Sequence, residues 1–286
     1  MVTRSILLVG GPDSGKTNFL ARLWPALDGS GQLEAKSVPD NLKYVLDNLN
    51  FMLSGEFAPR TQKKGDQAQL DEFVVDIGYS NGRAGGDARI IAPDVTGELW
   101  ENAVVTSEIS TDWMARIRDA DGALLFVRVH SQLNVDPLDW VTAEKLLQLQ
   151  NEDTGSDSHL PTQVFLSELL RFLEHSLKRT TAKPKVAVLI TAWDLLDAGT
   201  QNAGPNAYLQ NQYPLFAGRL KHTEELDVRI YGISIVGGDL NADEVFREQF
   251  LKKGLEGSGY IATDVQGSTS ISADLTLPLN WLLSAG

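Results

Sequence analysis

The chain has 286 residues, no cysteine, and 25 lysines and arginines against 38 aspartates and glutamates, which gives a formal net charge of −13 at pH 7. This length fits one large α/β domain, or at most two small ones. The acidic balance argues against nucleic acid or an anionic membrane as the main partner. The absence of cysteine excludes disulfides, thiolate metal sites and cysteine nucleophiles. No apolar run approaches membrane-spanning length and a first strand begins almost at Met1, so we expect a soluble, cytoplasmic protein.

The most informative stretch lies at the start of the chain. A short apolar run at residues 5–9 leads into Gly10-x-x-x-x-Gly15-Lys16-Thr17, and apolar residues at helical spacing follow. Strand, glycine loop and helix in this order predict a P-loop, whose backbone N–H groups converge on phosphate at the positive end of a helix. The alternative is a glycine-rich turn that binds nothing. The candidate nucleotide-binding residues here are Gly10, Asp13, Ser14, Gly15, Lys16, Thr17 and Asn18, with Lys16 at the β- and γ-phosphates and the Thr17 hydroxyl on Mg²⁺.

Helix and strand patterns alternate along the rest of the chain. A helix is predicted up to residue 53, and the polar segment 54–69 is typical of an exposed loop. A glycine-rich turn joins two strands into a hairpin. The predicted strands of the sheet are residues 5–9, 70–77, 88–92, 122–129, 185–191 and 227–236, and helices are predicted within 99–119, 165–177, 209–220 and 241–250.

This alternation predicts an α/β fold of the P-loop NTPase type, with three layers in the order α/β/α. We expect a mostly parallel six-stranded sheet in which the hairpin supplies one antiparallel strand. Helical insertions are expected at about 28–58 and 130–160. Residues 1–254 would form the P-loop domain, and residues 255–286 a C-terminal extension that packs on it.

Three further motifs stand at the ends of predicted strands. Asp94-Val95-Thr96-Gly97-Glu98 follows the hairpin, Thr191-Ala192-Trp193-Asp194 ends the fifth strand, and Gly232-Ile233-Ser234-Ile235 closes the sixth. With the P-loop before them, these motifs resemble those of the Ras-like, translation-factor-related class of P-loop GTPases. The resemblance covers roughly residues 2–253.

The resemblance implies a role for each motif. Asp94 would contact Mg²⁺, usually through water, and the Gly97 N–H would bond the γ-phosphate; a plain turn aspartate is the alternative for Asp94. Asp194 would accept hydrogen bonds from N1–H and the amine of guanine, and so reject adenine; a helix N-cap is its alternative. Thr191 stands where Asn is usual, Trp193 could stack on the base, and Ser234 lies in the loop that faces the base.

Turnover depends on residues that depart from the family pattern. Glu98 replaces the usual glutamine that orients water, so we expect slow intrinsic hydrolysis. In the exposed loop, Thr61 is the candidate switch threonine that reaches Mg²⁺ and the γ-phosphate. Arg60 is either an arginine finger supplied in cis or a solvated surface arginine.

The insertions, the C-terminal extension and the sequences Pro59-Arg60-Thr61 and TAWD together resemble the prokaryotic double-GTPase families. Such families are inferred to work in multi-component conflict or signalling systems. The expected function is a Mg²⁺-dependent GTP-binding and hydrolysing switch that controls partner proteins, with GTP/GDP and Mg²⁺ as cofactors. The alternatives are a nucleotide-binding scaffold with little hydrolysis and a P-loop ATPase.

Overall fold

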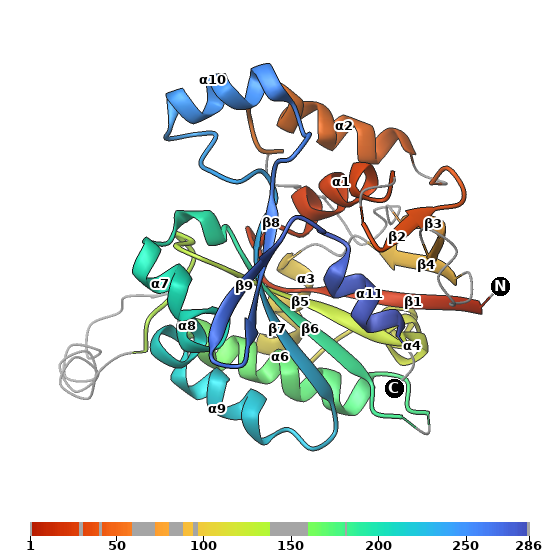
Figure 1. The fold of residues 1–286 in the computed structure, drawn as a ribbon. Helices are drawn as coiled ribbons and strands as arrows, with labels where there is room; N and C mark the ends of the chain where they lie inside the picture. The colour runs from red at the N-terminus through yellow and green to blue at the C-terminus, as the bar shows by residue number, and fades with distance from the viewer. Residues whose placement is uncertain are drawn as a thin grey trace, which may run out of the picture.

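The computed structural model describes residues 2–28, 31–39, 42–58, 72–79, 88–93, 97–137, 160–180 and 182–284. Its centre is a nine-stranded mixed sheet in the order β2-β3-β4-β1-β5-β6-β7-β8-β9 (Figure 1). The strands are β1 (Val2–Val9), β2 (Leu33–Ala35), β3 (Glu72–Tyr79), β4 (Ala88–Pro93), β5 (Gly122–Arg128), β6 (Lys185–Thr191), β7 (Asp227–Ser234), β8 (Tyr260–Val265) and β9 (Ser268–Ser272). Strands β4, β1, β5, β6 and β7 run parallel, whereas β3 and β8 run antiparallel to both of their neighbours.

The α/β class and the antiparallel hairpin strand are as predicted, but the prediction of six strands is wrong. The three additional strands are β2, β8 and β9. β2 is three residues long, too short to show a period of two. β9 lies at the sheet edge with most of its residues exposed, so its serines and threonines carry no apolar pattern. Only Ile261 and Ala262 of β8 are fully buried.

Helices cover both faces of the sheet. They are α1 (Lys16–Ala26), α2 (Leu42–Leu53), α3 (Gly97–Thr106), α4 (Thr111–Asp119), α6 (Thr162–Ser176), α7 (Ala198–Ala203), α8 (Pro205–Gln212), α9 (Pro214–His222), α10 (Glu244–Lys253) and α11 (Leu277–Leu283), with a 3₁₀ turn η2 at Trp193–Leu195. One core cluster joins the sheet to α3, α4, α6, α8 and α9, a second joins it to α1, α2 and α11, and a smaller third contains Met52 of α2 and Phe250 of α10 (Figure 1). No helix in the described ranges is both long and apolar enough to cross a membrane.

Two predicted helical segments are each divided in the structure. Ser107 adopts a positive φ of 58° between α3 and α4. The Ser110 side chain then caps α4 by accepting from the Trp113 N–H. Pro214 stands at the first position of α9, where its missing N–H is not needed, so α8 ends before it. Apolar periodicity continues across both breaks and does not reveal them.

Two buried cations attach the C-terminal part of the chain to the rest. Arg22 of α1 donates from Nε to the Ile235 carbonyl at 3.1 Å and from Nη2 to the Leu255 and Ser258 carbonyls at 3.2 and 2.9 Å. Burial lowers the pKa of Arg22 to about 10. At the start of β6, Lys185 Nζ donates to the carbonyls of Trp281 and Ser284 at 3.1 and 2.8 Å. Both side chains therefore connect distant parts of the chain through hydrogen bonds to backbone carbonyls.

Candidate functional site

The glycine loop lies where β1 ends and α1 begins. Gly15 precedes α1 with a φ of 91°, in the left-handed region that glycine adopts without a steric penalty. Glycine has no side chain that could cap the helix, so no N-cap side chain bonds the first backbone N–H groups of α1. This is the arrangement that binds anions at helix N-termini.

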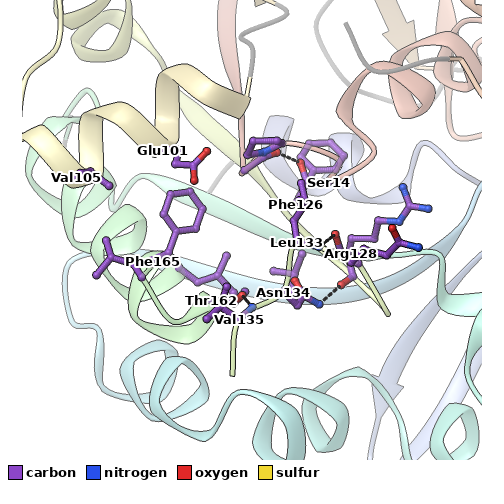
Figure 2. Close-up of a pocket in the computed structure, with 17 residues that line it drawn as sticks. Ser14, Glu101, Val105, Phe126, Arg128, Leu133, Asn134, Val135, Thr162 and Phe165 are labelled. Carbon is purple, nitrogen blue, oxygen red and sulfur yellow. Dashed lines mark hydrogen bonds between the residues drawn. The ribbon is translucent and has the colours of Figure 1, made fainter. Parts of the chain in front are cut away.

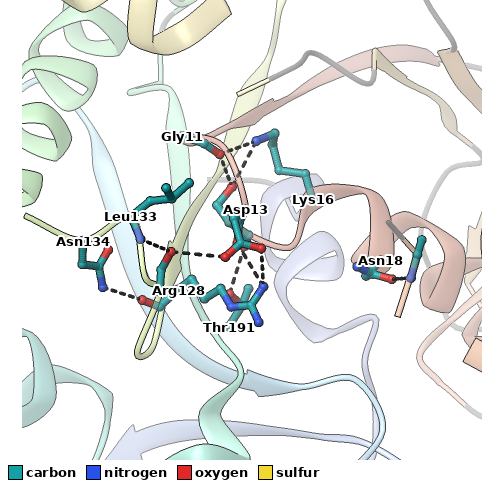
Figure 3. Close-up of polar contacts among 11 residues, drawn as sticks. Gly11, Asp13, Lys16, Asn18, Arg128, Leu133, Asn134 and Thr191 are labelled. Atoms are coloured by element: carbon teal, nitrogen blue, oxygen red, sulfur yellow. Dashed lines mark hydrogen bonds and ion pairs between the residues drawn. The ribbon is translucent and has the colours of Figure 1, made fainter. Parts of the chain in front are cut away.

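Lys16 extends along the inside of this loop. Its side chain is only 6% exposed, and Nζ donates to the carbonyls of Gly10 and Gly11 at 2.8 and 2.9 Å and to Ser14 Oγ at 3.0 Å (Figure 3). Ser14 Oγ in turn donates to the Gly11 carbonyl at 2.8 Å. The structure thus brings Gly10, Ser14, Gly15 and Lys16 together around one concavity.

The next two predicted residues lie on the first turn of α1. Thr17 is half-buried and follows Lys16 directly. The Asn18 side-chain oxygen accepts a hydrogen bond from the Ala58 N–H at 3.1 Å. Asn18 therefore holds the end of segment 42–58 against α1. The predicted residues Arg60, Thr61 and Asp94 lie outside the described part of the chain.

Gly97 opens α3 in direct backbone contact with the glycine loop. A Cβ atom added to Gly97 would lie 2.1 Å from the Pro12 nitrogen and 2.3 Å from the Gly11 carbonyl carbon. No side chain fits in this space. Trp100 holds the helix in place, since its Nε1 donates to the Leu8 carbonyl at 3.1 Å. Glu98 is exposed on the first turn of α3.

Thr191 joins the end of β6 to the glycine loop. Its Oγ1 donates to the Ser14 carbonyl at 2.9 Å and is buried. A Cβ on Gly15 would lie 3.4 Å from the same Oγ1. Thr191 thus fixes the distance between the phosphate loop and the turn that carries Asp194.

The prediction that Trp193 stacks on a base is wrong. Its side chain has 0% exposure and packs edge-on against Tyr208, with ring centroids 5.7 Å apart. The ring also lies against Gly232, where an added Cβ would come within 2.5 Å of Trp193 Cδ2. Ala192 has a φ of 56°, and the chain direction changes there as the strand ends. The indole points into the core and cannot reach a ligand.

Asp194 and Ser234 meet at the ends of neighbouring parallel strands. The Ser234 side chain hydrogen-bonds Asp194, and its oxygen accepts from the Gly237 N–H at 2.8 Å. Burial raises the pKa of Asp194, and the Ser234 hydrogen bond acts in the opposite direction. The N-cap alternative does not apply, because Asp197 caps α7 by accepting from the Thr200 N–H at 3.1 Å. Asp194 is thus held in place with its carboxylate committed to no helix end.

Tyr260 of the C-terminal hairpin is near enough to Asp194 for its pKa to respond to the charge of that carboxylate. Burial raises the pKa of Tyr260 on β8 to about 12, and the charge of Asp194 adds to the effect. Sequence reasoning did not single out Tyr260, since it lies in a Gly/Ser-rich segment outside the recognised motifs.

Arg128 and Ser131 are further site residues that sequence reasoning missed. Arg128 Nη1 donates to Asp13 Oδ1 at 2.6 Å and to the Asp13 carbonyl at 3.2 Å. Ser131 Oγ donates to Asp13 Oδ2 at 3.2 Å (Figure 3). The sequence feature that could have pointed to Arg128 is its position as the single arginine in the apolar run GALLFVRV.

A cavity of about 710 Å³ adjoins the glycine loop. Glu101 and Val105 of α3 and Phe165 of α6 line it, together with the loop residues Gly11 and Pro12 (Figure 2). No residue of β6 or β7 contributes to this cavity in the described chain. Its lining does include the loop residue Ser14 and the residues Arg128 and Ser131 that bond Asp13.

These features define a P-loop nucleotide-binding fold of the GTPase type: a glycine loop around Lys16, Gly97 against that loop, and Asp194 beside Ser234. The family model of Double-GTPase 1 matches residues 7–282, and the chain belongs to this family. Among solved structures, the chain is similar to one from the signal recognition particle receptor SRb-GTP/SRX complex of Chaetomium thermophilum. That match has 13% identity and a TM-score of 0.38, and covers 87% of this chain and 98% of the other. No curated protein matches the chain.

Proposed function

We propose that this protein is a Mg²⁺-dependent GTP-binding and GTP-hydrolysing switch that controls partner proteins in a prokaryotic defence or signalling system. The observation that carries the proposal is the pairing of Asp194 with Ser234, at a distance from the phosphate loop that Thr191 fixes. A carboxylate there accepts from the N1–H and amine of guanine, whereas adenine presents an acceptor at N1. Membership of the Double-GTPase 1 family supports guanine nucleotide binding.

Each part of the site has a proposed task. The backbone N–H groups at Gly15 and the start of α1, with Lys16, would hold the β- and γ-phosphates. Gly97 would present its N–H to the γ-phosphate from the start of α3. Glu98 would act on the attacking water, and Arg60 would stabilise the transition state in cis.

The donor set fits Mg²⁺. Thr17 supplies a hydroxyl oxygen on the first turn of α1, directly after Lys16. Hydroxyl and carboxylate oxygens are the ligands that this hard cation prefers. Asp94 and Thr61 would complete the protein ligands. Mg²⁺ held by these residues would supply positive charge that offsets the charge of the phosphates.

The second candidate is a nucleotide-binding scaffold with little hydrolysis. Glu98 favours it, because an exposed carboxylate beside Gly97 cannot donate a hydrogen bond as glutamine does. A P-loop ATPase is disfavoured by Asp194. Phosphate release after nucleotide binding separates the first two functions, and ADP binding tests the third.

Calorimetric titration with GDP, a non-hydrolysable GTP analogue and ADP, each with Mg²⁺, tests the proposal. We expect micromolar or tighter binding of both guanine nucleotides and no heat from ADP. ADP binding of similar strength would refute guanine selection and leave a P-loop NTPase without base preference.

Asp194→Asn should reverse the hydrogen-bond sense of the base site. We expect weaker GTP binding and stronger binding of xanthosine triphosphate, whose base carries an acceptor where guanine carries an amine. Asp197→Asn is the matched control, since Asp197 caps α7 three residues further on. Equal losses for both nucleotides in Asp194→Asn would contradict base reading.

Guanine nucleotide affinity should also fall on acidification. Burial raises the pKa of Asp194, so its carboxylate takes up a proton at a higher pH than an ordinary aspartate and then loses its acceptor role. The contribution of Asp194 to folding stability, in contrast, becomes more favourable on acidification, because the folded state binds this proton more readily than the unfolded state. GDP titrations from neutral to mildly acidic pH should show the loss, and Asp194→Asn should flatten it. A GDP affinity that is constant until the usual aspartate range would contradict this role.

A further inference from the structure

Asp13 places a negative charge inside the loop that we propose to bind phosphates. Its side chain is 40% exposed, and its backbone has a φ of 58°. For a residue with a Cβ this left-handed conformation is unfavourable unless the surroundings hold it. An uncompensated carboxylate at this position would also repel a polyphosphate. The loop therefore needs a group that neutralises Asp13 and fixes its backbone.

Arg128 meets both needs from the end of β5. Nη1 reaches the carboxylate oxygen Oδ1 at 2.6 Å and the main-chain carbonyl of the same residue at 3.2 Å. One guanidinium thus compensates the charge and binds the peptide unit that follows Asp13. Ser131 donates to the second carboxylate oxygen at 3.2 Å.

The segment that carries these donors is itself fixed. Asn134 Nδ2 donates to the Arg128 carbonyl at 3.3 Å (Figure 3). It also donates to the Tyr213 hydroxyl at 2.9 Å. Ser131 Oγ accepts from the Leu133 N–H at 3.2 Å. Arg128 also acts on Asp194, whose pKa its charge lowers. The guanidinium is thus close enough to both acidic groups of the proposed nucleotide site to act on them.

We propose that Arg128 is a positioning residue for the phosphate loop, which it prepares for a nucleoside polyphosphate by neutralising Asp13 and holding its left-handed backbone. The inference rests on the proposed function, because it takes a nucleotide as the occupant of the loop. In this proposal Arg128 acts through Asp13, at which both hydrogen bonds of Nη1 are directed.

Affinities for GDP and a GTP analogue, measured by calorimetry on five proteins, test this inference. They are the wild type, Arg128→Ala, Asp13→Gly, the double variant, and the control Arg171→Ala, whose arginine is exposed and paired with Glu168 within α6. Arg128→Ala should weaken binding roughly ten-fold or more, because the loop then carries a negative charge that no cation compensates. The double variant should bind about ten-fold better than Arg128→Ala, because glycine adopts a positive φ and carries no charge. Arg171→Ala should bind as the wild type does.

The possible outcomes separate this inference from the proposed function. A wild type that binds no guanine nucleotide refutes the proposed function. A wild type that binds, with Arg128→Ala equal to it, overturns the role of Arg128. A double variant as weak as Arg128→Ala also overturns it, because Arg128 then does not act through Asp13. Thermal unfolding reports folding of each variant, and Arg128→Gln, which keeps the length of the side chain, replaces Arg128→Ala if that protein does not fold.

Discussion

Lys16→Ala is expected to abolish detectable nucleotide binding and leave the fold intact. The ammonium is the cation at the centre of the glycine loop, where it lies within 3.0 Å of the Gly10 and Gly11 carbonyls and Ser14 Oγ. Hydrogen bonds to charged groups contribute about 1.5–3 kcal/mol each, so the loss of two to phosphate weakens binding roughly 100-fold or more. The hydrogen bonds of Nζ to Gly10, Gly11 and Ser14 lie within the loop itself, so we expect the core clusters on the two faces of the sheet to keep their packing.

Lys185→Ala is a matched control, because this second buried lysine lies at the start of β6 and holds the carbonyls of α11. It should lower the unfolding temperature and leave nucleotide affinity unchanged. Calorimetry and thermal unfolding followed by circular dichroism measure both properties. Unchanged GTP affinity in Lys16→Ala would refute the assignment of the loop to phosphate.

Gly97→Ala is the other substitution with a large expected effect. The new methyl would lie 2.1 Å from the Pro12 nitrogen and 2.3 Å from the Gly11 carbonyl carbon, and both are backbone atoms that no rotamer change can move. Either the glycine loop or the start of α3 must shift. Overpacking of this kind destabilises proteins by about 1–3 kcal/mol. Because Gly97 is proposed to face the γ-phosphate, affinity for the GTP analogue should fall more than affinity for GDP.

Gly218→Ala in α9 provides the control for Gly97→Ala. A Cβ at Gly218 meets nothing within 4 Å, so alanine should stabilise the helix by about 0.5–1 kcal/mol and not affect binding. Denaturant unfolding and nucleotide titration of both variants make the comparison. Gly97→Ala with the stability and affinities of the wild type would show that α3 does not contact the loop as described.

Local patterns predicted the parts of the site that are built from contiguous residues. The loop from Gly10 to Thr17 needs only its own glycines, its lysine and the flanking strand and helix, all of which are visible in the sequence. Parallel strands end at one edge, which also brings Thr191 at the end of β6 against the loop. The contact between Asp13 and Arg128 joins residues 115 positions apart and has no local signature.

The spacing of residues in the sequence also did not predict in which direction the side chains point just after a strand ends. Trp193 and Asp194 are neighbours, yet the first enters the core and the second lies beside Ser234. The left-handed backbone at Ala192 accompanies this difference, and nothing in the residue type of alanine predicts it. β9 escaped prediction because a polar strand at a sheet edge has no buried face to mark it, and β8 because only two of its residues are fully buried.

The core between the sheet and α1 has a consequence for how the chain folds. Leu20 of α1 and Ile6 of β1 share one cluster with Leu279 and Trp281 of α11, the last helix of the chain. This face of the sheet cannot be closed while the last helix is still being synthesised. Contacts between such distant parts of a chain form slowly, because a long loop must close before they contribute. The helix that follows the glycine loop therefore reaches its final packing only after α11 has been synthesised, and until then part of its apolar side is a surface that chaperones can bind.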